Sequence, residues 1–164
     1  MTDYAINTAP IAALPIAGEE SRFPVRRVYC IGRTYAAHAI EMGHYPDREI
    51  PFFFRKNSDN PVSSGEFPHP PRSTQVHPEA KMLVALKSGG RNIPVDRALD
   101  LVFADGLARD MTRRDLQGIA KKAGRPWAVG KAFERSAHAD RCILPHAFAT
   151  ARSPVWAMIW EAMT

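Results

Sequence analysis

Residues 101–117 read LVFADGLARDMTRRDLQ, and this stretch decides the fold. Its apolar first half predicts a strand over Val102–Ala108, with Asp105 and Gly106 disturbing it. Its polar second half opens a predicted helix over Thr112–Lys122. A strand that passes almost directly into a short helix favours a structure built of strands with a few short helices between them.

The boundaries of that helix carry their own signals. The hydroxyl of Thr112 suits an N-cap, and the carboxylate of Asp115 suits the positive first turn. A Gly-Arg-Pro-Trp turn follows at 124–127, and a single lysine, Lys131, comes directly after Gly130. Taken alone, such a lysine is most often a surface residue, so its spacing by itself predicts no function.

Further strands are predicted on both sides of this stretch. The β-branched and aromatic residues of 27–31 and 51–54 and the apolar residues of 81–86 favour strands. Glycines within 87–92 predict a turn that can close a hairpin, and 94–101 predicts a short helix. The proline-rich stretch 66–74 excludes regular structure. We therefore expect an α+β fold that is mainly β.

The chain has 164 residues, of which 45% are hydrophobic and 24% charged, as expected for one globular core. We expect an N-terminal arm over 1–22, a domain over 23–145 and an atypical tail over 146–164. The tail holds an apolar and aromatic block, which we expect to cover exposed core or to pair with a second copy of the chain.

Composition excludes several functional classes. The net charge of +5 permits anionic ligands, but the basic residues occur in short pairs without a nucleic-acid motif, so we expect no nucleic-acid partner. Prolines interrupt the N-terminal apolar residues, which predicts no signal peptide, and no apolar run predicts a membrane helix. Two distant cysteines, Cys30 and Cys142, fit reduced thiols in the cytoplasm.

A first candidate for chemistry is the segment GRTYAAHAIE at 32–41. A helix is predicted over Thr34–Met42, ending at Gly43, and His38 and Glu41 share one face of it. A carboxylate beside an imidazole fixes its tautomer and suits a general base. The alternative is an ordinary polar pair on a surface helix.

A second candidate is the segment VHPEAKMLV at 76–84. Side chains two residues apart on a strand point to the same side, and two carboxylates so spaced can hold a hard cation with a third from a neighbouring strand. Here Glu79 is acidic but Lys81 is basic, and an ammonium group cannot bind a metal ion. The alternative for Glu79 is a solvated surface charge.

Together these segments resemble the fumarylacetoacetate hydrolase family, and within it the fumarylpyruvate hydrolases (acylpyruvases), over roughly Phe23–Leu144. The matching features are Gly-Arg-x-Tyr-x-x-His-x-x-Glu, His-x-Glu and Asp-Met-Thr, followed by the lysine after Gly-Arg-Pro-Trp. The resemblance implies a mixed β-roll, similar to a β-clip, with short helices. It also implies that the C-terminal part of the family domain is missing.

The resemblance assigns roles to individual residues. Two of these roles are filled unusually: Thr34 replaces an asparagine of the family motif, and Lys81 stands where the family has a second ligand carboxylate. The implied catalytic residues are His38, Glu41 and Lys131; the implied substrate-binding residues are Arg33, Tyr35 and Lys56; the implied ligands of Mg²⁺ or Mn²⁺ are Glu79 and Asp110. We expect Lys81 to weaken metal binding and to pair with Glu79 or Asp110.

The resemblance implies a metal-dependent hydrolase that cleaves a C–C bond in a 2,4-dioxo acid such as fumarylpyruvate, giving fumarate and pyruvate. It also implies a cytoplasmic homodimer with a role in aromatic degradation. The alternative is a catalytically inactive, truncated family member that acts as an oligomeric or binding protein. Lys81 and the shortened C-terminus favour that alternative.

Overall fold

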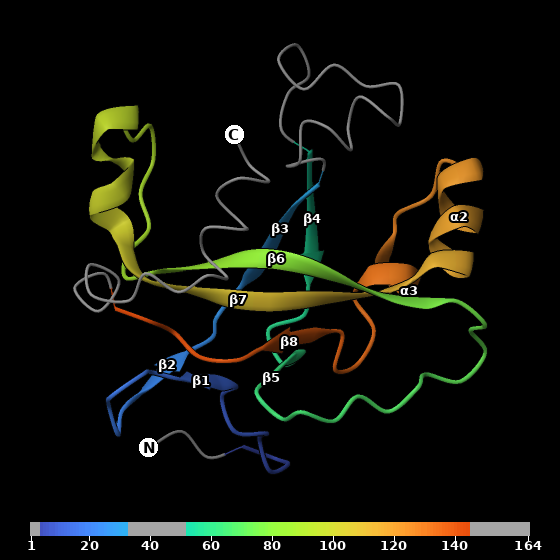
Figure 1. Ribbon diagram of the computed structural model, residues 1–164, viewed down its shortest axis with the longest axis horizontal. Helices are drawn as coiled ribbons and strands as arrows, with labels where there is room; N and C mark the ends of the chain where they lie inside the picture. Colours follow the sequence, from blue (N-terminus) through green and yellow to red (C-terminus); the bar gives the residue numbers. More distant parts are fainter. Residues whose placement is uncertain (1–3, 33–51, 145–164) are drawn as a thin grey trace.

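The computed structural model describes residues 4–32 and 52–144, and within these ranges it is built mainly of strands with a few short helices (Figure 1). The fold class predicted from sequence is therefore confirmed. The predictions for the helix at 34–42 and for the tail at 146–164 lie outside the described residues.

A long hairpin forms the centre of the molecule. Strands β6 (Val76–Leu86) and β7 (Val102–Arg113) pair antiparallel along almost their whole length, with Glu79 opposite Asp110. Both strands are longer than predicted. Pro78 is tolerated inside β6 because this strand lies at the edge of its sheet, where one row of backbone groups needs no partner.

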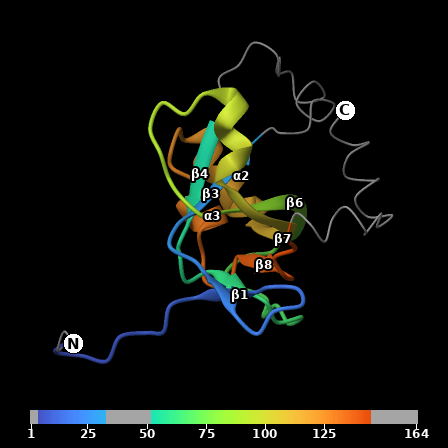
Figure 2. The ribbon, with the colours of Figure 1, turned by 90° about the vertical axis from the view of Figure 1, so that its left-hand side faces the viewer.

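The hairpin belongs to a four-stranded sheet with the order β5-β8-β7-β6, in which β5 (Pro61–Val62) runs parallel to β8 (Ala137–Ala139). Two separate ribbons pair antiparallel: β1 (Ala13–Pro15) with β2 (Arg22–Pro24), and β3 (Val28–Gly32) with β4 (Phe52–Lys56). Figures 1 and 2 show the β1–β2 ribbon on one side of the four-stranded sheet. The described strands do not close into a barrel.

Short helices lie at the two ends of the hairpin. A 3₁₀ helix, η1 (Val95–Leu101), lies at the end where β6 turns back into β7, and α2 (Arg114–Lys122) and α3 (Ala128–Lys131) lie at the other end (Figure 1). The predicted N-cap was wrong. Thr112 is still in β7, Arg113 takes the N-cap position without a side-chain hydrogen bond, and the Thr112 hydroxyl is used elsewhere.

The start of α2 is fixed by Asp115, as its place in the first turn predicted. Its carboxylate accepts hydrogen bonds from the Thr74 backbone N–H, the Ser73 hydroxyl and the Leu116 backbone N–H. The Thr74 N–H makes the largest contribution to lowering the pKa of Asp115 to about 2. The proline-rich loop before β6 is thereby tied to the helix.

The apolar core is small and lies between β1, the hairpin and the segment after β8. Its buried members are Leu14, Ile16, Val25, Ala85, Ala104, Ala139 and Cys142. The segment predicted as an arm thus supplies β1 and two core side chains. Gly106 does not interrupt β7: a Cβ there would lie 2.5 Å from the backbone oxygen of Arg141, so the glycine permits this close approach.

Candidate active site

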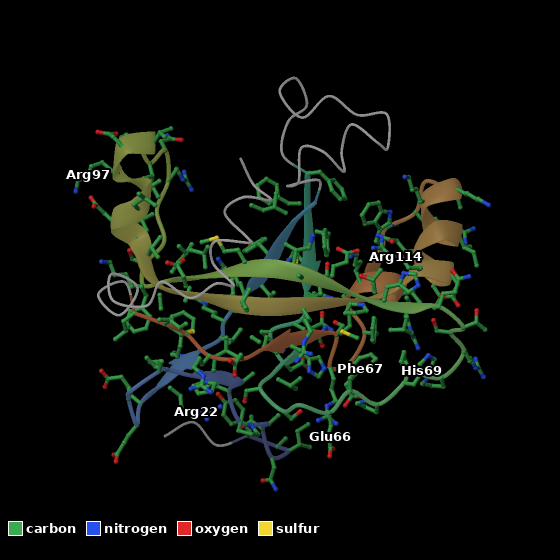
Figure 3. All side chains as sticks on the ribbon, viewed as in Figure 1. Arg22, Glu66, Phe67, His69, Arg97 and Arg114 are labelled. Carbon is green, nitrogen blue, oxygen red and sulfur yellow. The ribbon has the colours of Figure 1, made fainter. Side chains whose placement is uncertain are left out.

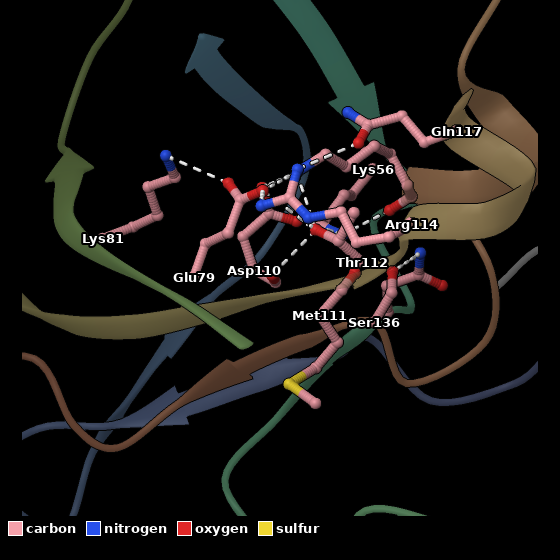
Figure 4. A network of polar contacts seen from close by, with 11 residues as sticks. Lys56, Glu79, Lys81, Asp110, Met111, Thr112, Arg114, Gln117 and Ser136 are labelled. Atoms are coloured by element: carbon pink, nitrogen blue, oxygen red, sulfur yellow. Dashed lines mark hydrogen bonds and ion pairs between the residues drawn. The ribbon is translucent and has the colours of Figure 1, made fainter. Parts of the chain in front are cut away.

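Two carboxylates face each other near the α2 end of the hairpin. Glu79 of β6 and Asp110 of β7 are opposite one another in the strand register, and their side chains lie in one network of polar contacts (Figure 4). Asp110 is almost completely buried, whereas Glu79 keeps partial access to solvent. Two carboxylates that face each other across neighbouring strands would repel each other strongly unless cations lie between them.

The ammonium group of Lys131 lies between the two carboxylates. Its Nζ is 2.9 Å from Glu79 Oε1, 2.7 Å from Asp110 Oδ2 and 2.7 Å from Thr112 Oγ1. An ammonium has three donors, and these three acceptors match them. Lys131 thus joins both strands of the hairpin through charge-assisted hydrogen bonds.

Helix packing brings Lys131 to this position. The side chain is held at the C-terminal end of α3, where Trp127 at the start of the helix packs against Phe52 and Phe54 of β4. Gly130 lets α3 approach α2 closely, because a Cβ there would lie 3.0 Å from atoms of Gln117. The Lys131 ammonium also lies 5.0 Å from the centre of the Phe54 ring, a favourable cation–π distance.

A second buried ammonium supports the outer side of Asp110. Lys56 Nζ, from the end of β4, lies 2.9 Å from Asp110 Oδ1 and donates to the backbone oxygens of Met111 and Lys131. The contact with Asp110 Oδ1 is an ion pair, and this buried oxygen accepts no hydrogen bond within the described residues.

Two further cations approach Glu79 from the solvent side. Lys81 Nζ lies 3.2 Å from Glu79 Oε2, and a guanidinium nitrogen of Arg114 lies 2.5 Å from Glu79 Oε1 (Figure 4). The other terminal nitrogen of Arg114 donates to Gln117, which holds the guanidinium in place. The expected pairing of Lys81 with an acidic ligand position is confirmed for Glu79.

The protonation of the cluster follows from these contacts. Burial alone would raise the pKa of Glu79, but the charges of Lys131, Lys81 and Arg114 outweigh burial and lower it to about 2. Burial lowers the pKa of Lys56, and Asp110 opposes that shift. Burial, reinforced by Asp110, raises the pKa of Cys30 to about 11, so this thiol is protonated at neutral pH and is a poor nucleophile.

The residues of this cluster do not fit a divalent metal ion. Among the described residues, no three His, Cys, Asp or Glu side chains come together in a group that could hold a metal. Both carboxylates, Glu79 and Asp110, are already paired with ammonium or guanidinium groups, and the third expected ligand is Lys81. A divalent cation would have to displace these groups and lie beside their positive charges.

The structure brings together four of the residues singled out in the sequence, namely Lys56, Glu79, Asp110 and Lys131, and adds Lys81 at their edge. His38, Glu41, Arg33 and Tyr35 lie outside the described residues. Sequence reasoning missed Thr112 and Arg114 as members of the cluster. Their signal was present: both follow Asp110 closely, at the point where β7 passes into α2.

Comparisons with known proteins identify the family to which the chain is similar. A family model described as the C-terminal domain of fumarylacetoacetate (FAA) hydrolase matches residues 27–157, which extends past the resemblance seen in the sequence. The crystal structure of a fumarylpyruvate hydrolase from Pseudomonas aeruginosa, in complex with Mn²⁺ and pyruvate, is similar with a TM-score of 0.83 and 41% identity. The match covers 92% of this chain and 66% of that one.

Curated relatives differ in their activities. A fumarylpyruvate hydrolase from Ralstonia sp. is 36% identical over 57% of this chain and 50% of its own length. A mitochondrial oxaloacetate decarboxylase from Dictyostelium discoideum is 38% identical over 66% of this chain and 50% of its own length. The chain therefore spans about half the length of these curated relatives. None of the described helices is long and apolar enough to span a membrane.

Proposed function

Because the chain belongs to the fumarylacetoacetate hydrolase family, we propose that it is a hydrolase of small 2,4-dioxo acids such as fumarylpyruvate. One observation supports this most directly: Glu79, Asp110 and Lys131, from three separate sequence motifs, meet in one buried cluster. The Pseudomonas aeruginosa and Ralstonia relatives are named as fumarylpyruvate hydrolases, which favours this substrate class.

The proposed reaction is addition of water followed by cleavage of one C–C bond. A base removes a proton from water, and the oxygen adds to the C4 carbonyl. The bond between C3 and C4 then breaks, and its electron pair passes to the 2-oxo group as an enolate. A proton returns to C3, so fumarylpyruvate and water give fumarate and pyruvate. The protein must stabilise two anionic species, the tetrahedral oxyanion at C4 and then the enolate of pyruvate.

Each group of the cluster has a proposed task in this reaction. Lys56 and Lys131 neutralise Asp110 and Glu79 and hold these carboxylates in fixed positions beneath the ligand. The other cations next to Glu79 attract the substrate carboxylate and the enolate oxygen. By the family resemblance, His38 oriented by Glu41 is the base that activates water, and Arg33 and Tyr35 contact the substrate. Neither Mg²⁺ nor Mn²⁺ takes part in this proposal, because the described residues around Glu79 and Asp110 do not fit either ion.

A second candidate reaction uses the same kind of intermediate. Tautomerisation or decarboxylation of oxaloacetate also passes through the enolate of a 2-oxo acid, and the Dictyostelium discoideum relative is named for the decarboxylation. A catalytically inactive binding protein is the third candidate, and Lys81 in the third ligand position favours it.

Ultraviolet absorbance separates these candidates, because the enol forms of 2,4-dioxo acids absorb strongly and lose this absorbance when C3–C4 is cleaved. The protein is incubated with fumarylpyruvate, acetylpyruvate or oxaloacetate, with and without Mg²⁺ or Mn²⁺, and pyruvate and fumarate are measured by chromatography. Fumarate formation that disappears in Lys131→Met supports the hydrolase. Activity on oxaloacetate alone supports the second candidate, and no turnover of any substrate supports the third.

The cellular setting is also a proposal. The bacterial relatives named as fumarylpyruvate hydrolases favour a cytoplasmic protein, whereas several other relatives are named as mitochondrial. We expect a homodimer, and light scattering of the purified chain measures its mass directly.

A further inference from the structure

A buried histidine, His138, lies in the middle of β8. In the strand register it is opposite Arg109 of β7 on one side and Val62 of β5 on the other. The residue is only 4% exposed. None of the contacts among the described residues joins it to the ion cluster around Asp110, and the proposed reaction does not use it.

The imidazole of His138 holds the loop that follows β5. Its Nδ1 lies 3.3 Å from the backbone oxygen of Ser64, and its ring meets the Phe67 ring edge to face at 5.4 Å between centres. The guanidinium of Arg135 adds a hydrogen bond to the Ser64 hydroxyl. Figure 3 shows Phe67 and its neighbour Glu66 on this loop. Because β5 has only two residues, residues 63–67 depend on these side-chain contacts for their place beside β8.

These contacts determine which nitrogen of the ring carries the hydrogen. A backbone oxygen can only accept, so Nδ1 carries the hydrogen that points to Ser64. Nε2 is then the unprotonated nitrogen, and it is buried without a hydrogen-bond partner among the described residues. A proton at Nε2 would create a buried imidazolium whose new N–H has no acceptor there, and this costs free energy.

The cations around the ring also oppose a second proton. Burial makes the largest contribution to lowering the pKa of His138, and the charges of Arg109 and Arg135 lower it further, while hydrogen bonds to the backbone of Ser64 and Arg135 oppose the shift. Arg113 lies on the same side of β7 as Arg109, four residues further along the strand. Its guanidinium lies over the ring of Phe133, which in turn contacts Phe67.

The carboxylates on the adjoining segments do not compensate for these cations. Asp110 follows Arg109 on β7, but it is paired with Lys56 and Lys131 in the ion cluster. The other acidic residues of these segments are exposed, and within the described part of the chain none of them forms an ion pair with His138; they are Glu66, Glu134 and Asp140.

We propose that His138 is an acid-sensitive switch: the neutral imidazole holds residues 63–67 against β8, and protonation of the imidazole releases them. In the released loop the histidine titrates near its ordinary value of 6.5, whereas the closed loop resists the proton. The closed form is therefore favoured above pH 6.5 and becomes less stable as the pH falls below that value. Release would uncover β8 beside β7, where Ala137 pairs with Asp110, so acid would loosen the sheet next to the ion cluster.

Limited proteolysis of the full chain with an endoproteinase that cleaves after glutamate tests the proposal. Cleavage after Glu66 requires an open loop, because the next residue, Phe67, packs against His138. Cleavage at the exposed Glu19 and Glu20 corrects for the effect of pH on the protease itself. Uptake of one proton on release predicts that the ratio of the two cleavage rates rises by up to about tenfold between pH 7.5 and pH 5.5.

Two variants and one control identify the titrating group. His138→Asn keeps an N–H near the position of Nδ1, and His138→Phe keeps the ring; both are neutral at every pH, so their cleavage ratio should not change with pH. His69→Asn removes an exposed histidine three residues from Glu66 and should keep the pH dependence of the unmodified chain.

A cleavage ratio that stays constant with pH in the unmodified chain would overturn the proposal, as would an equal rise in the two His138 variants. If these variants fail to fold, nuclear magnetic resonance of the His138 ring in the unmodified chain decides the matter. A titration midpoint below pH 6.5 supports the switch, and a midpoint at or above 6.5 overturns it. Neither measurement depends on catalytic activity, so the proposed function stands or fails separately.

Discussion

Replacing Lys131 by methionine tests the central claim that this ammonium holds the hairpin and the helices together. Methionine keeps most of the side-chain volume and its contact with Phe54 but removes the charge. The change leaves Glu79 and Asp110 opposite each other without the group that contacts both, at 2.9 Å and 2.7 Å. Removing one partner of a buried ion pair costs about 3–5 kcal/mol. Because Lys56 still pairs with Asp110 and Arg114 still pairs with Glu79, we expect a cost near the lower end of this range.

The structure supplies a matched comparison within the same cluster. Lys81→Met also removes an ammonium that pairs with Glu79, but this pair is partly exposed to solvent, and such an ion pair contributes about 0–1 kcal/mol. Urea unfolding followed by circular dichroism measures both variants. We expect a large fall in the free energy of unfolding for Lys131→Met and a small change for Lys81→Met at pH 7.

Acidification should narrow the difference between these two variants. In Lys131→Met, one of the two facing carboxylates can take up a proton, which removes their repulsion. The cost of the substitution should therefore be smaller at pH 5 than at pH 7. If Lys131→Met lowers the free energy of unfolding by less than about 1 kcal/mol at pH 7, or if the two variants lose equal amounts, the buried ion cluster does not depend on this lysine and the reasoning is refuted.

Two further predictions concern the fold and its acid sensitivity. Gly106→Ala should lower the free energy of unfolding by about 1–3 kcal/mol, because its Cβ would lie 2.5 Å from the Arg141 backbone oxygen. The control is Gly118→Ala, where a Cβ meets nothing within 4 Å, and it should be neutral or stabilising by up to about 1 kcal/mol. Equal effects of the two substitutions in denaturant titrations would contradict the close approach at Gly106. The pKa of Glu79 is lowered from 4.5 to about 2, so its contribution to stability is present above pH 4.5 and is lost as the pH falls toward 2. Glu79→Gln should therefore reduce the dependence of the free energy of unfolding on pH between these values. An unchanged slope would argue against the ion pairs of Glu79.

Of the described strands, the sequence predicted β3, β4, β6 and β7 but not the short strands β1, β2, β5 and β8. Enrichment in β-branched, aromatic and apolar residues located β3, β4 and the inner part of the hairpin. It underestimated β6 and β7, since their outer halves carry Glu79, Asp110 and other polar residues that usually indicate loops. Here the polar residues remain in strands because their charges are neutralised across the pair, which a pattern of hydrophobicity cannot show.

The same limitation explains the error at Thr112. A threonine before a polar helical segment is a good N-cap candidate by local rules. Tertiary contacts override that preference, because the Thr112 hydroxyl is the third acceptor of the Lys131 ammonium. The packing of α3 places the Lys131 ammonium between the two carboxylates. This packing depends on contacts of Trp127 with Phe52 and Phe54, which no local pattern in the sequence predicts.

The strand register explains why Lys81 does not take the position between the carboxylates. Lys81 pairs across the hairpin with Ala108, which offers no side-chain acceptor, whereas Glu79 pairs with Asp110. The Lys81 ammonium therefore reaches Glu79 along its own strand from the solvent side, and Lys131 enters between the strands from α3. Because Lys81 lies on an edge strand and contacts Glu79 from the solvent side, it leaves the contacts of Lys131 with Glu79 and Asp110 intact.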